Sequence, residues 1–302
     1  MNRPVIGLDI GGTNLRMGLV GRDFDASEVA VLPTRNIYET GNTVSALADV
    51  IRNYAIRHLS GMLGAIGMGL PSVVNRERTM VYSATNLPGL DGVNIVEELK
   101  SRLGVPVVID HDAYCILAHD IWAGAYPKQG NYIGIYFGTG LGNAIIINGR
   151  PYYGRNGTAA ELGHMPAAFD ETPCSCGNKG CIEMHSCGKA FERLWQNHYN
   201  ETPIGDVFVR HGGDAALNRF VKAMAVPVST EVNILDPDAV FVGGGLVHMQ
   251  GFPRDKFVEA VLANTRKPFP AENLQLVFNQ NSPVNGIIGA AQMAYEELDN
   301  YR

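Results

Sequence analysis

A histidine and three cysteines form the most informative group of residues in this chain. Cys174, Cys176 and Cys181 fall within eight residues, and His164 lies ten positions before the first of them. One imidazole and three thiolates are a sufficient ligand set for a tetrahedral structural zinc ion. The alternative is a loop whose cysteines are spaced by chance and whose histidine is satisfied in the core. Close cysteine pairs in a chain without secretory features favour metal or redox roles, so we predict a zinc site.

Two glycines and two glutamates accompany this group. Gly177 and Gly180 let the backbone turn tightly enough for nearby thiolates to converge on one ion. Glu161 and Glu183 flank the segment, so a zinc ion would fix two carboxylates relative to each other. Carboxylates beside a metal site also commonly orient its ligands, which leaves a purely structural role for both glutamates as an alternative.

A glycine-rich pattern occurs twice, shifted by 127 positions. Residues 6–21 read IGLDIGGTNLRMGLVG, and residues 133–148 read IGIYFGTGLGNAIIIN. Apolar runs broken by glycine and threonine predict a hairpin in each half, and tight glycine turns direct backbone N–H groups toward an anion. Either turn alone is also compatible with a structural hairpin. The recurrence predicts a nucleotide held in a cleft between two similar domains. Neither the dinucleotide fingerprint nor the P-loop sequence is present.

The rest of the chain alternates between helical and strand patterns, as in an α/β protein. Apolar spacing predicts helices at 43–58, 94–102, 113–125, several across 186–232, one at 254–265 and a last one after residue 286. Buried strands are expected at 64–74, 107–110, within 235–245 and at 274–279. Ligands of open α/β sheets bind beyond the carboxyl ends of strands. Asp9, Asp112 and the glycines at 138–142 and 243–245 follow such ends, and we expect them to face one crevice.

Composition indicates an intracellular enzyme. The 302 residues suffice for two domains with cores. A net charge of −6 without a basic stripe argues against nucleic-acid partners, and no apolar run is long enough to span a membrane. The first residues run directly into a strand pattern without room for a signal peptide, so we expect a cytoplasmic protein. Cys115 and Cys187 lie in apolar surroundings and are expected to be inert thiols.

These motifs together resemble the ROK family of bacterial sugar kinases, and the likeness runs essentially from end to end. It is carried by Asp9-Ile10-Gly11-Gly12-Thr13-Asn14, Gly69-Leu70-Pro71, Asn86-Leu87-Pro88-Gly89, Asp112, Gly138-Thr139-Gly140-Leu141-Gly142, Glu161-Leu162-Gly163-His164, the cysteine segment and Gly243-Gly244-Gly245. The resemblance implies an α/β protein with the actin-like ATPase fold, built from two ribonuclease-H-like domains around a central cleft. We expect a small domain at 1–117, closed by a helix at about 291–302, and a larger domain at 118–290 with the zinc insertion at 161–183.

The resemblance also implies roles for individual residues. Asp112 corresponds to the catalytic base that accepts the proton of the sugar's 6-hydroxyl, because a primary alcohol attacks phosphorus only as its proton is taken up. A strand-end cap is the alternative for Asp112. Sugar ligands would be Asn86, His111, Asp112, Glu161, His164 and Glu183, and His164 would also bind zinc with Cys174, Cys176 and Cys181. ATP with Mg²⁺ would contact Asp9, Gly11, Gly12, Thr13, Asn14, Gly138, Thr139, Gly140, Gly142, Gly243, Gly244 and Gly245.

Two departures from the family pattern concern the choice of sugar. His111 precedes the base where glucose-directed members carry asparagine, and Ser72 stands where glycine is usual. Both argue against a standard glucokinase, because polar sites discriminate sugar epimers by leaving a misplaced hydroxyl's partner unpaired. Residues 83–88, 154–164, 251–255 and 267–270 are similar to the branch of the family that phosphorylates D-allose, the 3-epimer of glucose.

Other functions stay open at this point. Glucose, fructose, N-acetylglucosamine and N-acetylmannosamine are the alternative sugars, and a non-catalytic sugar-sensing protein is a further class. Repressors of the family carry a DNA-binding domain before the sugar-binding domains, and the position of Asp9 leaves no space for one. The resemblance also implies a homodimer.

Overall fold

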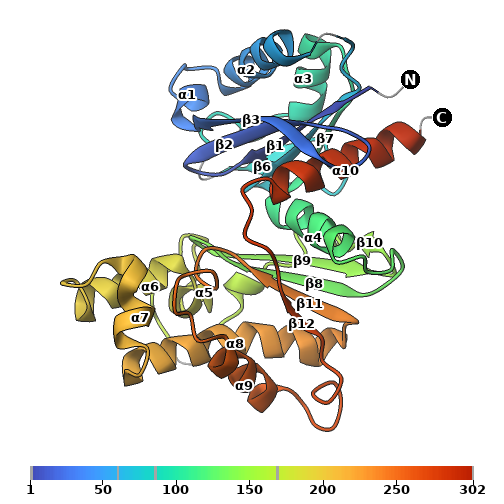
Figure 1. Cartoon of the computed structure of the whole chain (residues 1–302). Helices are drawn as coiled ribbons and strands as arrows, with labels where there is room; N and C mark the ends of the chain where they lie inside the picture. The colour runs from blue at the N-terminus through green and yellow to red at the C-terminus, as the bar shows by residue number, and fades with distance from the viewer. Residues whose placement is uncertain (1–2, 60, 85–86, 168–169, 301–302) are drawn as a thin grey trace. The chain divides into compact units, whose positions relative to one another are not determined.

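A computed structural model of the chain describes residues 3–59, 61–84, 87–167 and 170–300 (Figure 1). The chain divides into two compact units. Unit 1 comprises Met1–Pro127, Tyr153–Ala159 and Ser282–Arg302, and unit 2 comprises Lys128–Tyr152 and Ala160–Asn281. The boundary that we expected after residue 117 falls inside a helix, α4 (Asp112–Ala123), whereas the compact units divide after Pro127.

Unit 1 is built on a five-stranded sheet with the order β3-β2-β1-β4-β7. The strands are β1 (Val5–Ile10), β2 (Asn14–Val20), β3 (Ala26–Pro33), β4 (Ala65–Leu70) and β7 (Val107–His111). The first three are antiparallel neighbours, and β4 and β7 run parallel to β1. A small second sheet pairs β5 (Val73–Val74) with β6 (Val81–Ser83).

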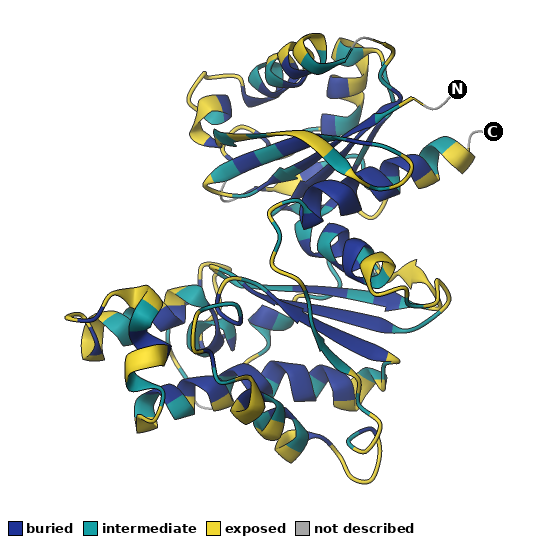
Figure 2. Ribbon diagram, in the orientation of Figure 1, coloured by how far each residue is buried: buried dark blue, intermediate teal, exposed yellow. Residues whose placement is uncertain are grey.

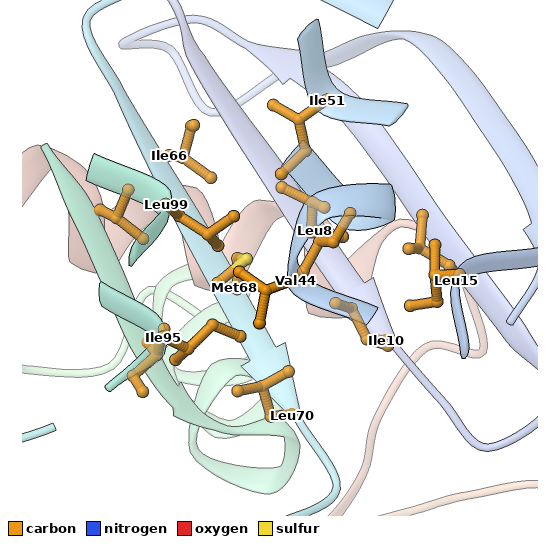
Figure 3. Packing of buried hydrophobic residues seen from close by; sticks show 14 of the residues in the cluster. Leu8, Ile10, Leu15, Val44, Ile51, Ile66, Met68, Leu70, Ile95 and Leu99 are labelled. Atoms are coloured by element: carbon orange, nitrogen blue, oxygen red, sulfur yellow. The ribbon is translucent and has the colours of Figure 1, made fainter. Parts of the chain in front are cut away.

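Helices cover both faces of this sheet (Figure 1). One face carries α1 (Arg35–Tyr38), α2 (Thr43–His58) and α3 (Ile95–Leu103); the other carries α4 and α10 (Asn285–Asn300). Because side chains alternate along a strand, Leu8 and Met68 point into the core under α2 and α3 (Figure 3). Gly67 lies on the opposite face, where a Cβ atom would come 1.9 Å from the carbonyl oxygen of Ala290. The glycine therefore allows α10 to pack directly on β4.

Unit 2 repeats this topology in the order β10-β9-β8-β11-β12. The strands are β8 (Tyr132–Phe137), β9 (Leu141–Ile147), β10 (Arg150–Pro151), β11 (Ala239–Gly243) and β12 (Leu276–Phe278). Again an antiparallel hairpin is followed by two parallel strands. Its helices are α5 (Glu183–Ser186), α6 (Gly188–His198), α7 (Val207–His211), α8 (Ala215–Leu235) and α9 (Arg254–Asn264), with short 3₁₀ turns η1 (Leu162–His164) and η2 (Ile204–Asp206). The predicted internal repeat is confirmed.

Helix and strand positions expected from the sequence are matched closely. Asn42 and Asn94 begin α2 and α3 by accepting hydrogen bonds from backbone N–H groups three residues on. The sequence analysis missed β3, an edge strand that is mostly exposed although its second half is an apolar run, Val29–Leu32. The buried strands and the exposed edges are seen in Figure 2.

No helix of the described segments is long and apolar enough to cross a membrane.

Candidate active site and metal centre

Two aspartates lie in one row across the sheet of unit 1. Asp9 on β1 is in register with Gly69 on β4, which is in register with Asp110 on β7. Arg16 on β2 places Nη1 3.4 Å from Oδ2 of Asp9. The pKa of Asp9 is raised to about 6, chiefly by burial and also by the nearby Asp112, while Arg16 opposes the rise. Asp9 and Asp112 therefore lie near each other toward the carboxyl ends of β1 and β7.

Asp112 begins α4 immediately after β7. Its Oδ1 accepts the N–H of Ala113 at 2.8 Å and lies 3.0 Å from Nδ1 of His111. A Cβ atom on Gly69 would lie 3.3 Å from the Cα atom of Asp112, so the glycine leaves room for the start of this helix. The Asp112 side chain is 31 % exposed. A carboxylate in this position is both oriented by its neighbours and accessible to a substrate proton.

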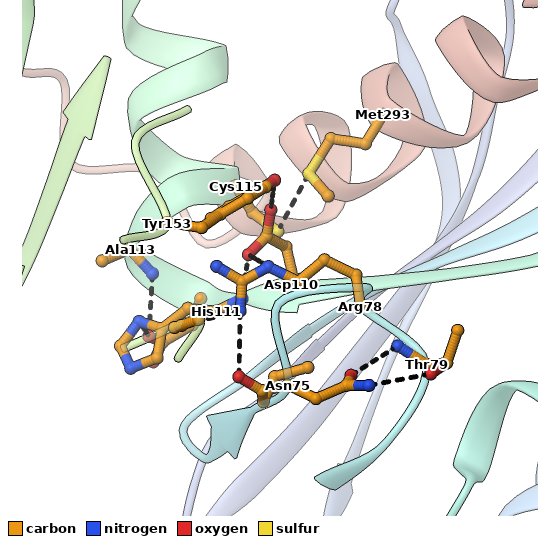
Figure 4. Close-up of polar contacts among 12 residues, drawn as sticks. Asn75, Arg78, Thr79, Asp110, His111, Ala113, Cys115, Tyr153 and Met293 are labelled. Carbon is orange, nitrogen blue, oxygen red and sulfur yellow. Dashed lines mark hydrogen bonds and ion pairs between the residues drawn. The ribbon is translucent and has the colours of Figure 1, made fainter. Parts of the chain in front are cut away.

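Asp110, two residues earlier, is fully buried and is held by two hydrogen bonds and one ion pair (Figure 4). Its Oδ1 accepts the N–H of His111 at 2.7 Å and faces Nε of Arg78 at 3.2 Å. The hydroxyl of Tyr153 donates to Oδ2. Burial raises the pKa of Asp110, and Arg78 together with these hydrogen bonds opposes that rise. Sequence reasoning did not find Arg78 or Tyr153, because no local motif marks two residues so far from position 110.

The glycine turn of unit 1 follows β1. The N–H of Gly11 donates to the carbonyl of Asn14 at 2.8 Å, and the hydroxyl of Thr34 donates to the carbonyl of Gly11 at 2.7 Å. Gly12 and Thr13, at the tip, are exposed. The turn is thus fixed at its base and open at its tip, which suits a contact with a ligand.

The two glycine turns of unit 2 lie next to each other. The N–H of Leu246, directly after Gly243-Gly244-Gly245, donates to the carbonyl of Phe137 at 3.1 Å. The N–H of Gly188, the first residue of α6, donates to the carbonyl of Gly138 at 2.8 Å. The structure therefore brings 138–142 and 243–245 together at the carboxyl ends of β8 and β11, where they were expected.

His164, Cys174, Cys176 and Cys181 form one cluster. Their ligand atoms all lie within 4.8 Å of one another. Sγ of Cys176 is 3.6 Å from Sγ of Cys181, and Sγ of Cys174 is 3.6 Å from Nδ1 of His164. Ligands of a tetrahedral zinc ion bound at about 2.3 Å are separated by about 3.8 Å, so the donor set and its spacing fit this ion.

The backbone around the cluster is arranged as the glycines predict. Gly177 and Gly180 adopt left-handed φ angles of 95° and 68°. The N–H of Cys174 donates to the carbonyl of Asn178 at 2.8 Å, closing the turn that carries Cys176. Glycine is favoured here because other residues are strained at positive φ.

The two glutamates lie on either side of His164. Oε2 of Glu161 is 3.6 Å from Nε2 of His164, and Oε1 of Glu183 is 3.7 Å from Nδ1. Oε1 of Glu183 also lies 3.3 Å from Sγ of Cys174, and a Cβ atom on Gly140 would lie 3.2 Å from Oε2. Glu183 therefore joins the cysteine cluster to the glycine turn after β8, while Nε2 of His164 faces Glu161.

The predicted site residues are divided between the units. Asp9, the turn at 11–14, His111 and Asp112 belong to unit 1; the turns at 138–142 and 243–245, Glu161, His164, Glu183 and the three cysteines belong to unit 2. Asn86 lies outside the described residues. Ser72, the second departure from the family pattern, is buried, and its Oγ makes no hydrogen bond within the described parts of the chain.

Comparisons with known proteins agree with these features. The model of the ROK family matches residues 5–297. An N-acetyl-D-glucosamine kinase of Pectobacterium carotovorum subsp. carotovorum is 30 % identical over 257 residues, covering 80 % of this chain and 83 % of the relative.

Solved structures show the same fold. A ROK family glucokinase from Streptomyces griseus, in complex with glucose and AMPPNP, matches with a TM-score of 0.80 and 25 % identity, covering 97 % of this chain and 99 % of that one. A ROK family transcriptional regulator, a homologue of the E. coli MLC protein, matches with a TM-score of 0.83 and 18 % identity, covering 99 % and 79 %. The likeness, together with the two sheets of equal strand order, confirms the predicted actin-like ATPase fold.

Proposed function

The chain belongs to the ROK family, and from this membership we propose that it is an ATP-dependent hexose kinase that phosphorylates the 6-hydroxyl of its sugar. The observation that carries the proposal is Asp112, a partly exposed carboxylate at the start of α4, oriented by the N–H of Ala113 and by His111. A sugar-binding protein without catalysis would not need such a base in addition to glycine turns that can hold phosphates.

Asp112 would accept the proton of the 6-hydroxyl as the oxygen attacks phosphorus. Protein groups in phosphoryl transfer act mainly by positioning and by electrostatic stabilisation. In this proposal the carboxylate keeps its orientation while the alcohol approaches its free oxygen, because Oδ1 is already engaged by Ala113. When bound, Mg²⁺ would offset the negative charge that spreads over the transferred group.

The glycine turns would bind the nucleotide. Backbone N–H groups at Gly11, Gly12, Thr13 and Asn14 in unit 1 would contact phosphate oxygens, because successive amides of a tight turn form an anion-binding concavity. In unit 2, Gly138, Thr139, Gly140 and Gly142 would do the same, and Gly243, Gly244 and Gly245 would flank the adenosine. The hydrogen bond from Leu246 to Phe137 supports this assignment, since it holds the two segments of unit 2 side by side.

The zinc centre would hold the sugar ligands of unit 2. We propose that His164, Cys174, Cys176 and Cys181 bind one structural zinc ion, with Nδ1 of His164 directed at the metal. Nε2 and the Glu161 carboxylate would then face sugar hydroxyls, together with Glu183. The proposal is supported by the 3.6 Å separation of Nδ1 from Sγ of Cys174 and by the position of Nε2 beside Glu161. Asn86 remains a proposed ligand by family position alone.

D-allose is the sugar that we propose. His111 next to the base replaces the amide of glucose-directed members with an imidazole, and Nδ1 of that ring is 3.0 Å from Asp112. A hydroxyl at carbon 3 that is inverted relative to glucose would meet a different donor there. N-acetyl-D-glucosamine is the second candidate, because it is the substrate named for a relative that is 30 % identical over most of its length.

An ADP-release assay across D-allose, D-glucose, D-fructose, N-acetylglucosamine and N-acetylmannosamine tests the function. We expect ADP release that depends on both sugar and Mg²⁺, with the highest kcat/KM for D-allose. If kcat/KM were highest for N-acetylglucosamine, the proposed substrate would be wrong but the proposed kinase activity would stand. The absence of sugar-dependent ADP release with every hexose would contradict the proposed kinase activity.

We also propose that the protein is a homodimer, which analytical sedimentation at micromolar concentration checks.

A further inference from the structure

We infer that Arg78 and Tyr153 are positioning residues for Asp112, and that they act through the buried carboxylate of Asp110. The inference rests on the proposed function, because Asp112 is the base of that reaction. All four residues belong to unit 1, and Figure 4 shows how Arg78, Asp110 and Tyr153 converge.

The first step is the bond between Asp110 and the backbone that leads to the base. Oδ1 of Asp110 accepts the N–H of His111 at 2.7 Å. The next residue is Asp112, whose Oδ1 faces the His111 ring. Rotation of the Asp110 carboxylate would therefore move the peptide and the imidazole that orient the base.

The second step is that Arg78 fixes this carboxylate from a different part of the chain. Arg78 lies in the turn between β5 and β6 and adopts a φ of 55°, which a side-chain-bearing residue keeps only when its surroundings hold it. Its Nε is 3.2 Å from Oδ1 of Asp110, and its Nη1 donates to the carbonyl of Gly157 at 3.2 Å. Asn75 stiffens the turn, since its Oδ1 accepts the N–H groups of Thr79 and Met80 at 2.8 Å.

The third step is that Tyr153 closes the arrangement from the other side. Its hydroxyl donates to Oδ2 of Asp110, and its ring lies under the Arg78 guanidinium, 3.6 Å from Cζ to the ring centroid. The same ring packs edge-on against Tyr114, with 5.3 Å between centroids. Tyr114 is two residues after Asp112 in the first turn of α4. Tyr153 thus contacts the residues two positions before and two positions after the base in the sequence.

A stabilising role alone does not account for this arrangement. Burying a carboxylate and a guanidinium costs free energy that their attraction barely offsets, so such pairs are weak evidence for stability. They do hold groups in fixed geometry, and a displacement of about 1 Å at a reacting group costs roughly 10²-fold in rate. Positional control of Asp112 is therefore the effect that we expect Arg78 and Tyr153 to exert.

A double-mutant cycle separates positioning from general stability. Tyr153→Phe removes only the hydroxyl and keeps the ring under Arg78. We expect it to lower kcat by roughly 10–100-fold, while KM for sugar and for ATP changes by less than about threefold. In an Asp112→Asn background the same substitution should have no further effect on the residual turnover, measured with enzyme in excess over sugar. Tyr82→Phe, at an exposed tyrosine of the same unit, is the matched control.

Arg78→Lys adds a second line of evidence. Lysine keeps the charge but cannot contact Asp110 and Gly157 together, so kcat should again fall without a matching change in KM. Arg102→Lys, at an exposed arginine paired with Glu98, is its control. If the Arg78 variant fails to fold, the Tyr153 cycle decides alone. An unchanged kcat for Tyr153→Phe overturns the inference, as does an equal loss in the Asp112→Asn background. If Asp112→Asn itself keeps normal turnover, the proposed base fails first and this inference fails with it.

Discussion

The two units have the same strand order but hold their carboxylates by different means. In unit 1, Asp110 is fixed by a buried hydrogen-bonded network drawn from three distant segments, and Asp112 follows it. In unit 2, Glu161 and Glu183 lie against a cluster of one histidine and three cysteines. The first arrangement requires the whole unit to fold, whereas the second is made by residues within about twenty positions of one another.

Because of this difference, the geometry around the carboxylates should be lost in two different ways. A hydrogen-bonded network loses its geometry when one partner is changed, even if the fold remains intact. A metal cluster loses its geometry when the ion leaves, even if no residue is changed. Perturbations of the two units should therefore be distinguishable by experiment, and the predictions below run from the largest expected effect to the smallest.

The largest effect is expected at the base of unit 1. Asp112→Asn keeps the side chain's size but removes its capacity to accept a proton, so turnover should fall by about 10²–10⁴-fold while sugar binding stays nearly intact. Turnover by ADP release and sugar affinity by calorimetry check the two halves of this prediction. Near-normal turnover of the purified variant would mean that unit 1 does not supply the base.

The contrast also explains what could be predicted from the sequence. The cysteine cluster was found because its ligands are close in sequence and have a restricted chemistry. The repeated hairpins were found because their apolar runs and glycine turns are local, and the same holds for α2 and α3, whose asparagine caps sit directly before them.

The network around Asp110 could not be found in this way. Arg78, Asp110 and Tyr153 are separated by 32 and 43 positions, and an arginine or tyrosine outside a motif is compatible with any exposed site. Only the parallel pairing of β4 with β7 and the return of Tyr153–Ala159 to unit 1 bring them together. The return of Tyr153–Ala159 to unit 1 could not be predicted either, because a short segment that returns to an earlier unit leaves no compositional signal.

The second prediction concerns the cluster of unit 2. Elemental analysis of protein purified without chelator should find one zinc ion per chain. Cys176→Ser should lower the zinc content and reduce turnover by roughly 10²-fold, because the loop that carries Glu183 would lose its anchor. Hydrogen exchange should increase around 174–183 and remain unchanged in β1 and β4 of unit 1.

Lys179→Ala is the matched control for this loop. Lys179 lies between the cysteines but is exposed and pairs only with Glu171 among the described residues, so zinc content and turnover should not change. Protein without zinc that retains full activity would show that unit 2 fixes its glutamates without a metal.

The third prediction compares two buried carboxyl groups. Asp110 accepts two hydrogen bonds and faces the Arg78 guanidinium, whereas Glu231 on α8 accepts one hydrogen bond among the described residues, from Nδ2 of Asn143 at 2.9 Å. Burial raises the pKa of Glu231 to about 8 from an ordinary value of 4.5, and the Asn143 hydrogen bond opposes the rise. The folded state therefore binds a proton that the unfolded state releases between these values, so unfolding free energy should fall as pH rises from about 5 to about 8, on the order of 3 kcal/mol.

Glu231→Gln should remove this pH dependence, because the amide cannot ionise. Urea unfolding at pH 5 and pH 8 measures it, with Glu192→Gln on the exposed side of α6 as the control. An equal slope of the unfolding free energy against pH in wild type and the Glu231 variant would show that Glu231 is not the source of the pH dependence.

The smallest effect on activity is expected for substitution of His111, and it tests whether a residue of unit 1 also recognises the sugar. If its ring meets the 3-hydroxyl, wild-type kcat/KM should be higher for D-allose than for D-glucose, and His111→Asn should narrow that ratio by roughly tenfold, the value of one hydrogen bond. The decrease in kcat/KM should be larger for D-allose than for D-glucose. His198→Asn, at an exposed histidine of α6, should leave the ratio unchanged. An unchanged ratio in the His111 variant would assign the choice of epimer to other residues, and Glu161 and Glu183 of unit 2 would be the next to test. The kinase proposal would stand in that case, because it depends on Asp112 and the glycine turns rather than on His111.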